Sequence, residues 1–195
     1  MALRQAAVSM CLIAAAVVVV SCSSGTGGRA EPAAGIPTGG PTSQAPKVDQ
    51  PLNASTLVAQ PCSSLTTGNV TGIGLSNPVN SPDKDANGTS CVWAGEAGGS
   101  IAVSWVTANT HGLSDLYVKQ STFSYWQPTT IAGYPAVYAD ALGDHRSDGD
   151  CVLYVGASDQ LAFFTEYDNP GDAAHACPLA GKAAADVIAN LKGGA

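Results

Sequence analysis

The sequence predicts an α+β domain: a small antiparallel β-sheet with helices packed on one face, held by two disulfides. Three observations lead to this prediction. Short segments in which large and small residues alternate, as in half-buried strands, occupy the second half of the chain. A run with helical spacing of apolar residues closes it. Four cysteines, Cys62, Cys91, Cys151 and Cys177, are spread over the part of the chain that contains these segments and the residues just before them.

The chain begins with a segment typical of an export signal. Arg4 precedes an apolar run over residues 6–20, which is shorter than the roughly 20 residues of a membrane-spanning helix. The run ends in Val19-Val20-Ser21-Cys22, which resembles the bacterial lipobox, whose cysteine receives the lipid. We therefore expect a signal peptide over residues 1–21, a lipidated Cys22, and a location on the outer face of the cell membrane.

A disordered tether is expected next, over residues 22–50. Gly, Ser, Thr, Pro and Ala dominate Ser23–Gln50, and large apolar residues are almost absent. Such a segment cannot bury enough surface to offset its chain entropy. The prediction is therefore a lipidated cysteine with a tether, followed by a single α+β domain over residues 51–195.

Strands and loops alternate through the predicted domain. Asn77–Gly88 is rich in Pro, Asp, Asn and Gly and is expected to form a long loop. Ser158-Asp159 is expected to turn between the last two strands. The expected strands cover residues 91–94, 101–105, 136–141, 151–157 and 161–167.

Three helices are expected. Cys62–Gly72 follows residues suited to a helix start, although Gly68 and Gly72 weaken it. Leu113–Gln120 is expected to be short. Pro178–Leu191 carries apolar residues at helical spacing, and Pro178 is acceptable in its first turn.

Four cysteines outside the cytoplasm indicate two disulfides, for which three connectivities exist. We favour Cys62–Cys91 and Cys151–Cys177, and the second bond would join the last helix to a strand. Zinc is the competing use of four cysteines, but no Cys-x-x-Cys pair is present.

Several motifs in this order resemble a known family. They are Pro61-Cys62-Ser63-Ser64-Leu65, Cys91-Val92-Trp93, Ile131-Ala132-Gly133-Tyr134-Pro135-Ala136, a strand headed by Cys151 and a last helix entered at Cys177. Together with the lipobox and tether, they resemble the actinobacterial domain of unknown function found among mycobacterial Lpr- and Lpq-type lipoproteins, over about residues 55–192. The resemblance implies a cell-envelope lipoprotein and the disulfide pairing favoured above, and it implies no activity.

Charge excludes one class of partner. The net charge is −7 and no basic stripe is present, so nucleic-acid binding is not expected. The membrane is expected as a partner through the lipid on Cys22 alone, and no cofactor is indicated.

Candidate ligand residues are few. Asp83, Asp85 and Asn87 match the first half of a calcium loop, but Ala94 stands where the closing Glu belongs, and the loop would run through Cys91. They are therefore weak metal candidates, and a polar turn is the favoured interpretation.

A second acidic stretch, Asp144–Asp150, is expected to be a solvated loop, with cation binding as the alternative. His111, His145 and His175 belong to no recognisable nucleophile motif, so no enzyme is expected. Tyr125-Trp126 are either core residues, which we favour, or an exposed grip for a partner.

The functional expectation is accordingly a non-catalytic interaction or accessory module of the cell envelope, with an envelope protein as its partner. A carrier or sensor of a small apolar ligand or lipid is the first alternative. A cell-wall-modifying hydrolase is the second, and it requires carboxylates or a His–carboxylate pair converging in a cleft.

Overall fold

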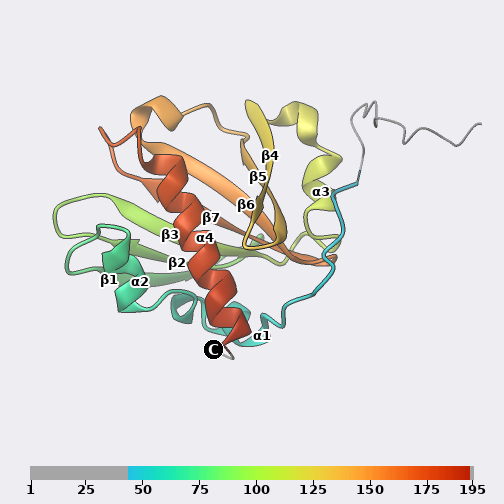
Figure 1. Cartoon of the computed structure of the whole chain (residues 1–195), viewed down its shortest axis with the longest axis horizontal. Coiled ribbons are helices and arrows are strands. Elements are labelled where there is room, and N and C mark those ends of the chain that lie inside the picture. The colour runs from blue at the N-terminus through green and yellow to red at the C-terminus, as the bar shows by residue number, and fades with distance from the viewer. Residues whose placement is uncertain (1–43, 194–195) are drawn as a thin grey trace, which may run out of the picture. The chain divides into compact units, whose positions relative to one another are not determined.

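A seven-stranded antiparallel sheet in the order β1-β2-β3-β7-β6-β5-β4 forms the centre of the fold (Figure 1). The computed structural model describes residues 44–193. The strands are β1 (Val79–Lys84), β2 (Gly88–Ala94), β3 (Ser100–Val106), β4 (Tyr125–Ile131), β5 (Tyr134–Asp140), β6 (Asp150–Ser158) and β7 (Leu161–Asp168). The five central strands correspond to the five that the sequence predicts, each to within a few residues.

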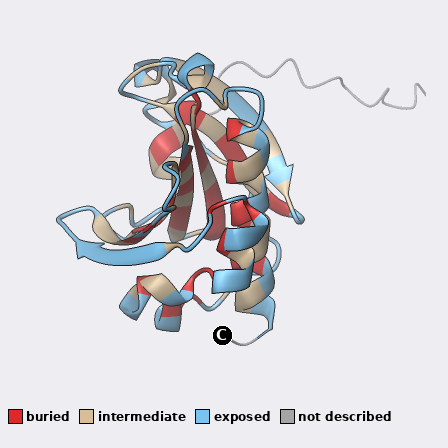
Figure 2. Cartoon of the chain, turned by 90° about the vertical axis from the view of Figure 1, so that its left-hand side faces the viewer, coloured by how far each residue is buried: buried red, intermediate tan, exposed pale blue. Residues whose placement is uncertain are grey.

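The two edge strands are the ones that the sequence analysis missed. β1 lies inside the segment expected to be a loop, and that prediction is wrong over Val79–Lys84. All six residues of β1 are exposed, so no burial pattern marks the strand, and only backbone pairing with β2 defines it (Figure 2). Pro82 in β1 and Pro128 in β4 are suited to edges, because proline cannot donate to a further strand.

The longest helix, α4 (Ala176–Lys192), lies across β6 and β7 on one face of the sheet, which we call the helix face (Figure 1). It is the helix predicted over Pro178–Leu191, with nearly the same bounds. Small side chains let the helix approach the strands closely, and the Thr165 hydroxyl donates to the Ala180 carbonyl oxygen over 2.9 Å. The fully or almost fully buried residues of α4 are Ala176, Ala180, Ala183, Ala184, Val187 and Ile188.

A layer of short helices completes the helix face. The single helix predicted over Cys62–Gly72 is divided into a 3-10 turn at Pro61–Ser63 and α2 (Thr67–Gly72), preceded by α1 (Ser55–Ala59). The reason is local: Thr66 forms a capping box with Asn69, so a new helix starts there and the preceding turn ends. The Trp105 indole N–H donates to the Ser64 hydroxyl over 3.1 Å, which ties this layer to the core.

The opposite face of the sheet is only partly covered. The short helix α3 (Ser114–Tyr117), followed by a 3-10 turn at Gln120–Thr122, packs there over Val137, Ala139 and Ala162. On the rest of this face, mainly over β3, β7 and the first half of β6, residues 44–193 place no helix, and we call it the open face.

The packed domain begins earlier than residue 51. Val48 is buried, its backbone N–H donates to the Asp159 carboxylate over 3.1 Å, and Lys47 forms an ion pair with the same residue. The C-terminal end of the predicted tether therefore belongs to the domain. The predicted signal peptide, the lipidated Cys22 and the tether up to residue 43 lie outside the described residues. Within residues 44–193, no helix is both long and apolar enough for a membrane crossing.

Both predicted disulfides are confirmed. Cys62–Cys91 joins the 3-10 turn to β2, and Cys151–Cys177 joins β6 to the first turn of α4. Each bond lies on the helix face and links a helical segment to a strand. The Cys91 and Cys151 side chains are fully buried, so the two bonds are part of the core.

The two-residue turn between β4 and β5 holds a non-glycine residue, Ala132, in a strained backbone conformation. Ala132 has φ 49° and Gly133 has φ 90°, and positive φ at both central residues is typical of a type I′ hairpin turn. Alanine is strained there, whereas Asn tolerates this conformation. We expect Ala132→Asn to raise the free energy of unfolding by roughly 0.5–1 kcal/mol in urea titrations. An unchanged midpoint would show that the turn is not strained.

Candidate functional site

A cleft of about 470 Å³ on the open face brings together carboxyl groups that have no evident role in the fold. Three strands supply its carboxylates: Glu166 from β7, Asp150 from β6 and Asp140 from the end of β5. The sheet register explains the convergence, because Glu166 pairs with Val152 and Asp150 pairs with Asp168. The residues lining the cleft are Asp140, Ala141, Leu142, His145, Asp150, Val152, Tyr154, Phe164 and Glu166.

The position of Asp150 depends on a close approach of two loops. Gly149 has φ 97°, and a Cβ atom at this residue would collide with the backbone carbonyl of Asn169. The Asn169 N–H donates to the Gly149 carbonyl over 3.0 Å, which fixes the two loops together. A glycine is therefore required immediately before Asp150, and the carboxyl group enters the cleft from a rigid segment.

The carboxyl groups of the cleft are costly to ionise. Burial, together with smaller contributions from the nearby Asp150, Asp140 and Asp168, raises the pKa of Glu166 to about 7. Burial also raises the pKa of Asp150, again with contributions from Asp168 and Asp140. The Asp150 Oδ1 atom is buried without a hydrogen-bond partner among the described protein atoms. A buried carboxylate oxygen without a hydrogen-bond partner is unusual, and together with the raised pKa values it makes this cleft the strongest candidate site.

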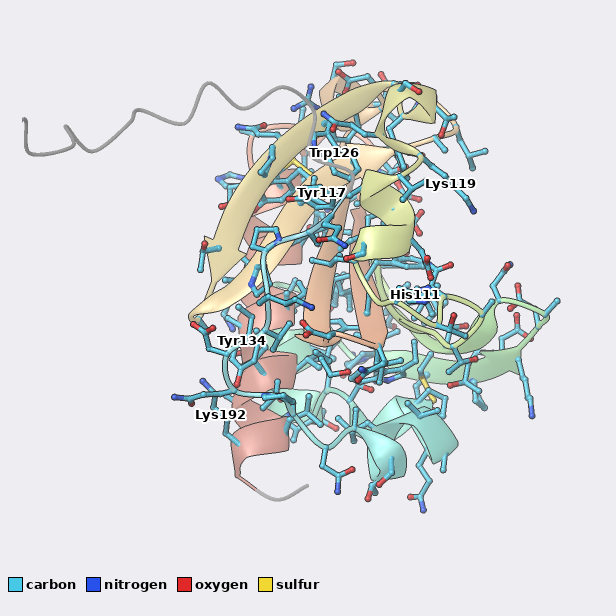
Figure 3. All side chains as sticks on the ribbon, turned by 90° about the vertical axis from the view of Figure 1, so that its right-hand side faces the viewer. His111, Tyr117, Lys119, Trp126, Tyr134 and Lys192 are labelled. Carbon is cyan, nitrogen blue, oxygen red and sulfur yellow. A yellow bond between two sulfur atoms is a disulfide. The ribbon has the colours of Figure 1, made fainter. Side chains whose placement is uncertain are left out.

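Aromatic rings form the floor of the cleft. Phe164 and Tyr154 point to the open face with their centroids 5.2 Å apart. Tyr154 also contacts Phe123, which packs on Trp126, and Trp126 packs edge-on against Tyr117 (Figure 3). The five rings make a continuous series of contacts from α3 to the cleft, and these contacts restrain the two rings of the floor.

The rim of the cleft carries the second acidic stretch of the sequence. Arg146 donates to both carboxylate oxygens of Asp144, at 2.7 Å each, and its guanidinium lies 4.1 Å from the centroid of the Tyr125 ring. His145 contacts Asp148 over 3.4 Å. Most of this stretch is thus an exposed loop, as the sequence predicts, and His145 and Asp150 are the members that line the cleft.

The calcium candidates do not converge on a common point. Asp85 accepts hydrogen bonds from the backbone N–H groups of Asn87 and Gly88, at 2.8 and 3.0 Å, and these bonds lower its pKa. Asp83 accepts from the N–H of its own neighbour, Lys84. Asp83 therefore lies near the end of β1, and Asp85 and Asn87 form the polar turn between β1 and β2. Residues 44–193 contain no cluster of three or more groups able to hold a metal ion.

The remaining candidates have structural partners. His111 contacts Asp115 over 3.1 Å and His175 contacts Asp172 over 2.6 Å, so both imidazoles lie beside a carboxylate at the surface. Tyr125 and Trp126 are half-buried and point to opposite faces of β4: Trp126 packs in the aromatic series and Tyr125 lies beneath Arg146. The favoured interpretation of these rings as packing residues is thus correct for Trp126.

Sequence reasoning missed Glu166 and Asp140. The only available signal was the alternation of β7, in which Glu166 shares a face with Ala162 and Phe164 in the middle of a central strand. A carboxylate at such a position is rare without a partner. Nothing in the sequence places Asp140 beside it, because that proximity depends on the pairing of β5 with β6 and of β6 with β7.

Comparison with known proteins places the chain in a family. The family described as a protein of unknown function (DUF3558) matches residues 17–190, which is most of the chain. No curated protein and no solved structure matches it. The family match agrees with the uncharacterised domain that the motifs around the four cysteines resemble. The chain therefore belongs to the DUF3558 family of proteins of unknown function.

Proposed function

We propose that this chain is an extracytoplasmic lipoprotein of the actinobacterial type, anchored through Cys22, whose domain binds an envelope protein at the acidic cleft without catalysis. The lipobox-like Val19–Cys22 and the tether support the anchor. The two disulfides support an oxidising compartment. The tether gives the domain reach to meet a partner held elsewhere in the envelope.

One observation carries the binding role: the carboxyl groups of Glu166 and Asp150 are partly buried in an open cleft and form no ion pair within residues 44–193. Uncompensated carboxylates on a central strand destabilise a fold, and residues that oppose stability in this way are typical of binding sites. A cationic group from a partner would supply the missing charge. The charge of the cleft is therefore better matched by a cationic ligand than by the rest of the domain.

The packing weighs against a carrier of apolar ligands. Such a ligand would require a space between α4 and the sheet, and that layer is filled by fully buried side chains, among them Val187, Leu153 and Phe163. The largest clefts that we find among the described residues lie at the surface and carry charged residues on their walls. Neither feature suits a lipid tail.

Hydrolysis is a second candidate function, and the same cleft favours it. A carboxyl group with a pKa near 7 beside further carboxyl groups is the arrangement from which glycosidases draw a general acid. Our proposal predicts that the chain releases no soluble fragments from purified cell wall. Release by the wild-type chain that Glu166→Gln abolishes would establish hydrolysis instead.

Cross-linking in living cells tests the binding role. A photoreactive amino acid at Leu142, which is 92% exposed at the cleft, is expected to capture one reproducible protein partner. Val79 is 73% exposed on β1, three strands from β7, and the same substitution there is the matched control. Equal capture at both positions, or none at Leu142, would contradict the proposal.

The same cells test the anchor. The wild-type chain is expected in the membrane fraction, and Cys22→Ala is expected to lose that association because no lipid can be attached. A Cys22→Ala chain that stays with the membrane in a processed, signal-free form would contradict the lipid anchor.

A further inference from the structure

The domain already contains one guanidinium held by acid and aromatic groups. Arg146 makes a two-pronged contact with the Asp144 carboxylate and stacks on the Tyr125 ring at 4.1 Å. Planar stacking together with paired hydrogen bonds is a property of arginine that lysine lacks. The rim of the cleft thus shows how this surface accommodates a guanidinium group.

The cleft itself offers the same two elements, and no lysine or arginine of the described residues lines it. Glu166, Asp150 and Asp140 provide carboxyl groups, and Phe164 and Tyr154 provide ring faces. None of these three carboxyl groups takes part in an ion pair among the described residues. The buried Asp150 Oδ1 has no hydrogen-bond partner among the described residues, so the domain itself leaves this carboxyl group partly uncompensated.

The open face also extends beyond the cleft. A second cleft of about 110 Å³ lies over β2 and β3, and Phe164 lines both. Its walls include Ser90 and Ser104, which offer hydroxyl groups to a backbone, and Asp85 adds further negative charge. Two clefts that share Phe164 as a wall, one of them acidic, suit an extended peptide segment with a single basic anchor more than they suit a small molecule.

We infer that the acidic cleft binds the guanidinium group of an arginine side chain presented by a partner protein. The inference rests on the proposed binding function and names the chemistry of its partner. The arginine donates to the Asp150 and Glu166 carboxylates while its plane lies on the Phe164 ring. The peptide on either side of the arginine runs over the open face.

Binding is coupled to pH through Glu166. The ionisable groups facing it are Asp150 and Tyr154 on β6, Asp140 on β5 and Asp168 on β7, and His145 lines the same cleft beside Asp150. Protonated Glu166 has no charge to offer, so a guanidinium competes with the proton. With the pKa of Glu166 near 7, the ionised fraction falls about tenfold from pH 8 to pH 6, and we expect the affinity to fall by a similar factor.

A peptide titration followed by NMR tests this inference. The full chain in non-ionic detergent is titrated with acetyl-Gly-Arg-Gly-amide, and with the peptide in which citrulline, neutral and of the same shape, replaces arginine. We expect shifts at the amides of Val152 and Glu166, and affinity for the citrulline peptide at least about tenfold weaker. Equal affinity for the two peptides, or shifts confined to other surfaces, would overturn the inference.

Two variants complete the test. Glu166→Gln is expected to weaken arginine binding about tenfold at pH 8 and to abolish its pH dependence, whereas Asp49→Asn, at an exposed carboxyl outside the cleft, is expected to change neither. Retained pH dependence in Glu166→Gln overturns the inference. If Leu142 captures a partner in cells and the arginine peptide does not bind, this inference fails alone; if Leu142 captures nothing, the proposed function fails with it.

Discussion

Replacing Glu166 by glutamine is expected to stabilise the domain at alkaline pH by about 3 kcal/mol. The pKa of Glu166 in the folded chain is about 7, raised from an ordinary value of 4.5 by burial and by the neighbouring carboxyl groups. The folded state therefore holds a proton that the unfolded state has lost, between about pH 4.5 and pH 7. Stability from this group is complete below pH 4.5 and is lost as the pH rises through 7, at about 1.4 kcal/mol for each pKa unit.

The measurement is urea denaturation of both chains from pH 5 to pH 8. At pH 5 the wild-type chain should be less stable than Glu166→Gln by only about 1 kcal/mol, because the folded state keeps the Glu166 proton and the unfolded state has just begun to lose it. At pH 8 the difference should reach its full value of about 3 kcal/mol.

Glu96→Gln provides the matched control. Glu96 is exposed and accepts a hydrogen bond from Asn77, so its neutralisation should not produce a growing difference from the wild-type chain above pH 6. Parallel pH profiles for wild type and Glu166→Gln would mean that Glu166 ionises freely in the folded chain. The argument that the cleft lacks a counter-charge would then fail.

Glu166 is expected to lower the stability of the domain, so its position follows none of the patterns by which a sequence indicates its fold. For this reason sequence reasoning found the fold more readily than the site. In a segment such as Ile101–Trp105, large apolar and small residues alternate because every second side chain packs in the core. Burial therefore produces a sequence pattern that predicts the strand. The exposed edge strand β1 has no core to mark it and was missed. The predicted disulfides followed from the pairing of neighbouring cysteines and from the family resemblance, and each links a helical segment to a strand.

The cleft is the opposite case, because it contradicts the rules that make a sequence readable. Glu166 occupies a position at which the alternation of β7 predicts nothing unusual, and its significance appears only when Asp150 and Asp140 lie beside it. Register between strands determines that proximity, and a single sequence does not specify register between strands far apart in the chain. Asp150 was noticed only as part of an acidic loop, where its neighbours are indeed solvated.

The largest expected loss of stability comes from removing the disulfides. The Cys151–Cys177 bond closes a loop with a sequence separation of 26 and Cys62–Cys91 one of 29. Loss of loop-closure entropy from the unfolded chain predicts a cost of roughly 3–4 kcal/mol for either pair when both cysteines become alanine. Urea denaturation should therefore give nearly equal losses, since the two loops differ little in length.

Hydrogen exchange should distinguish the two variants, because the bonds restrain unlike parts of the fold. α4 has 17 residues and buries a whole face on β6 and β7, so it remains docked without Cys151–Cys177, and exchange should accelerate through global unfolding. α1, the 3-10 turn and α2 have five, three and six residues, too short to persist alone. Without Cys62–Cys91 this layer should open separately, with fast exchange at Leu57 and Val70 while β6 stays protected. Uniform acceleration in both variants would instead mean that the short helices unfold only together with the sheet, and that the domain is a single cooperative unit.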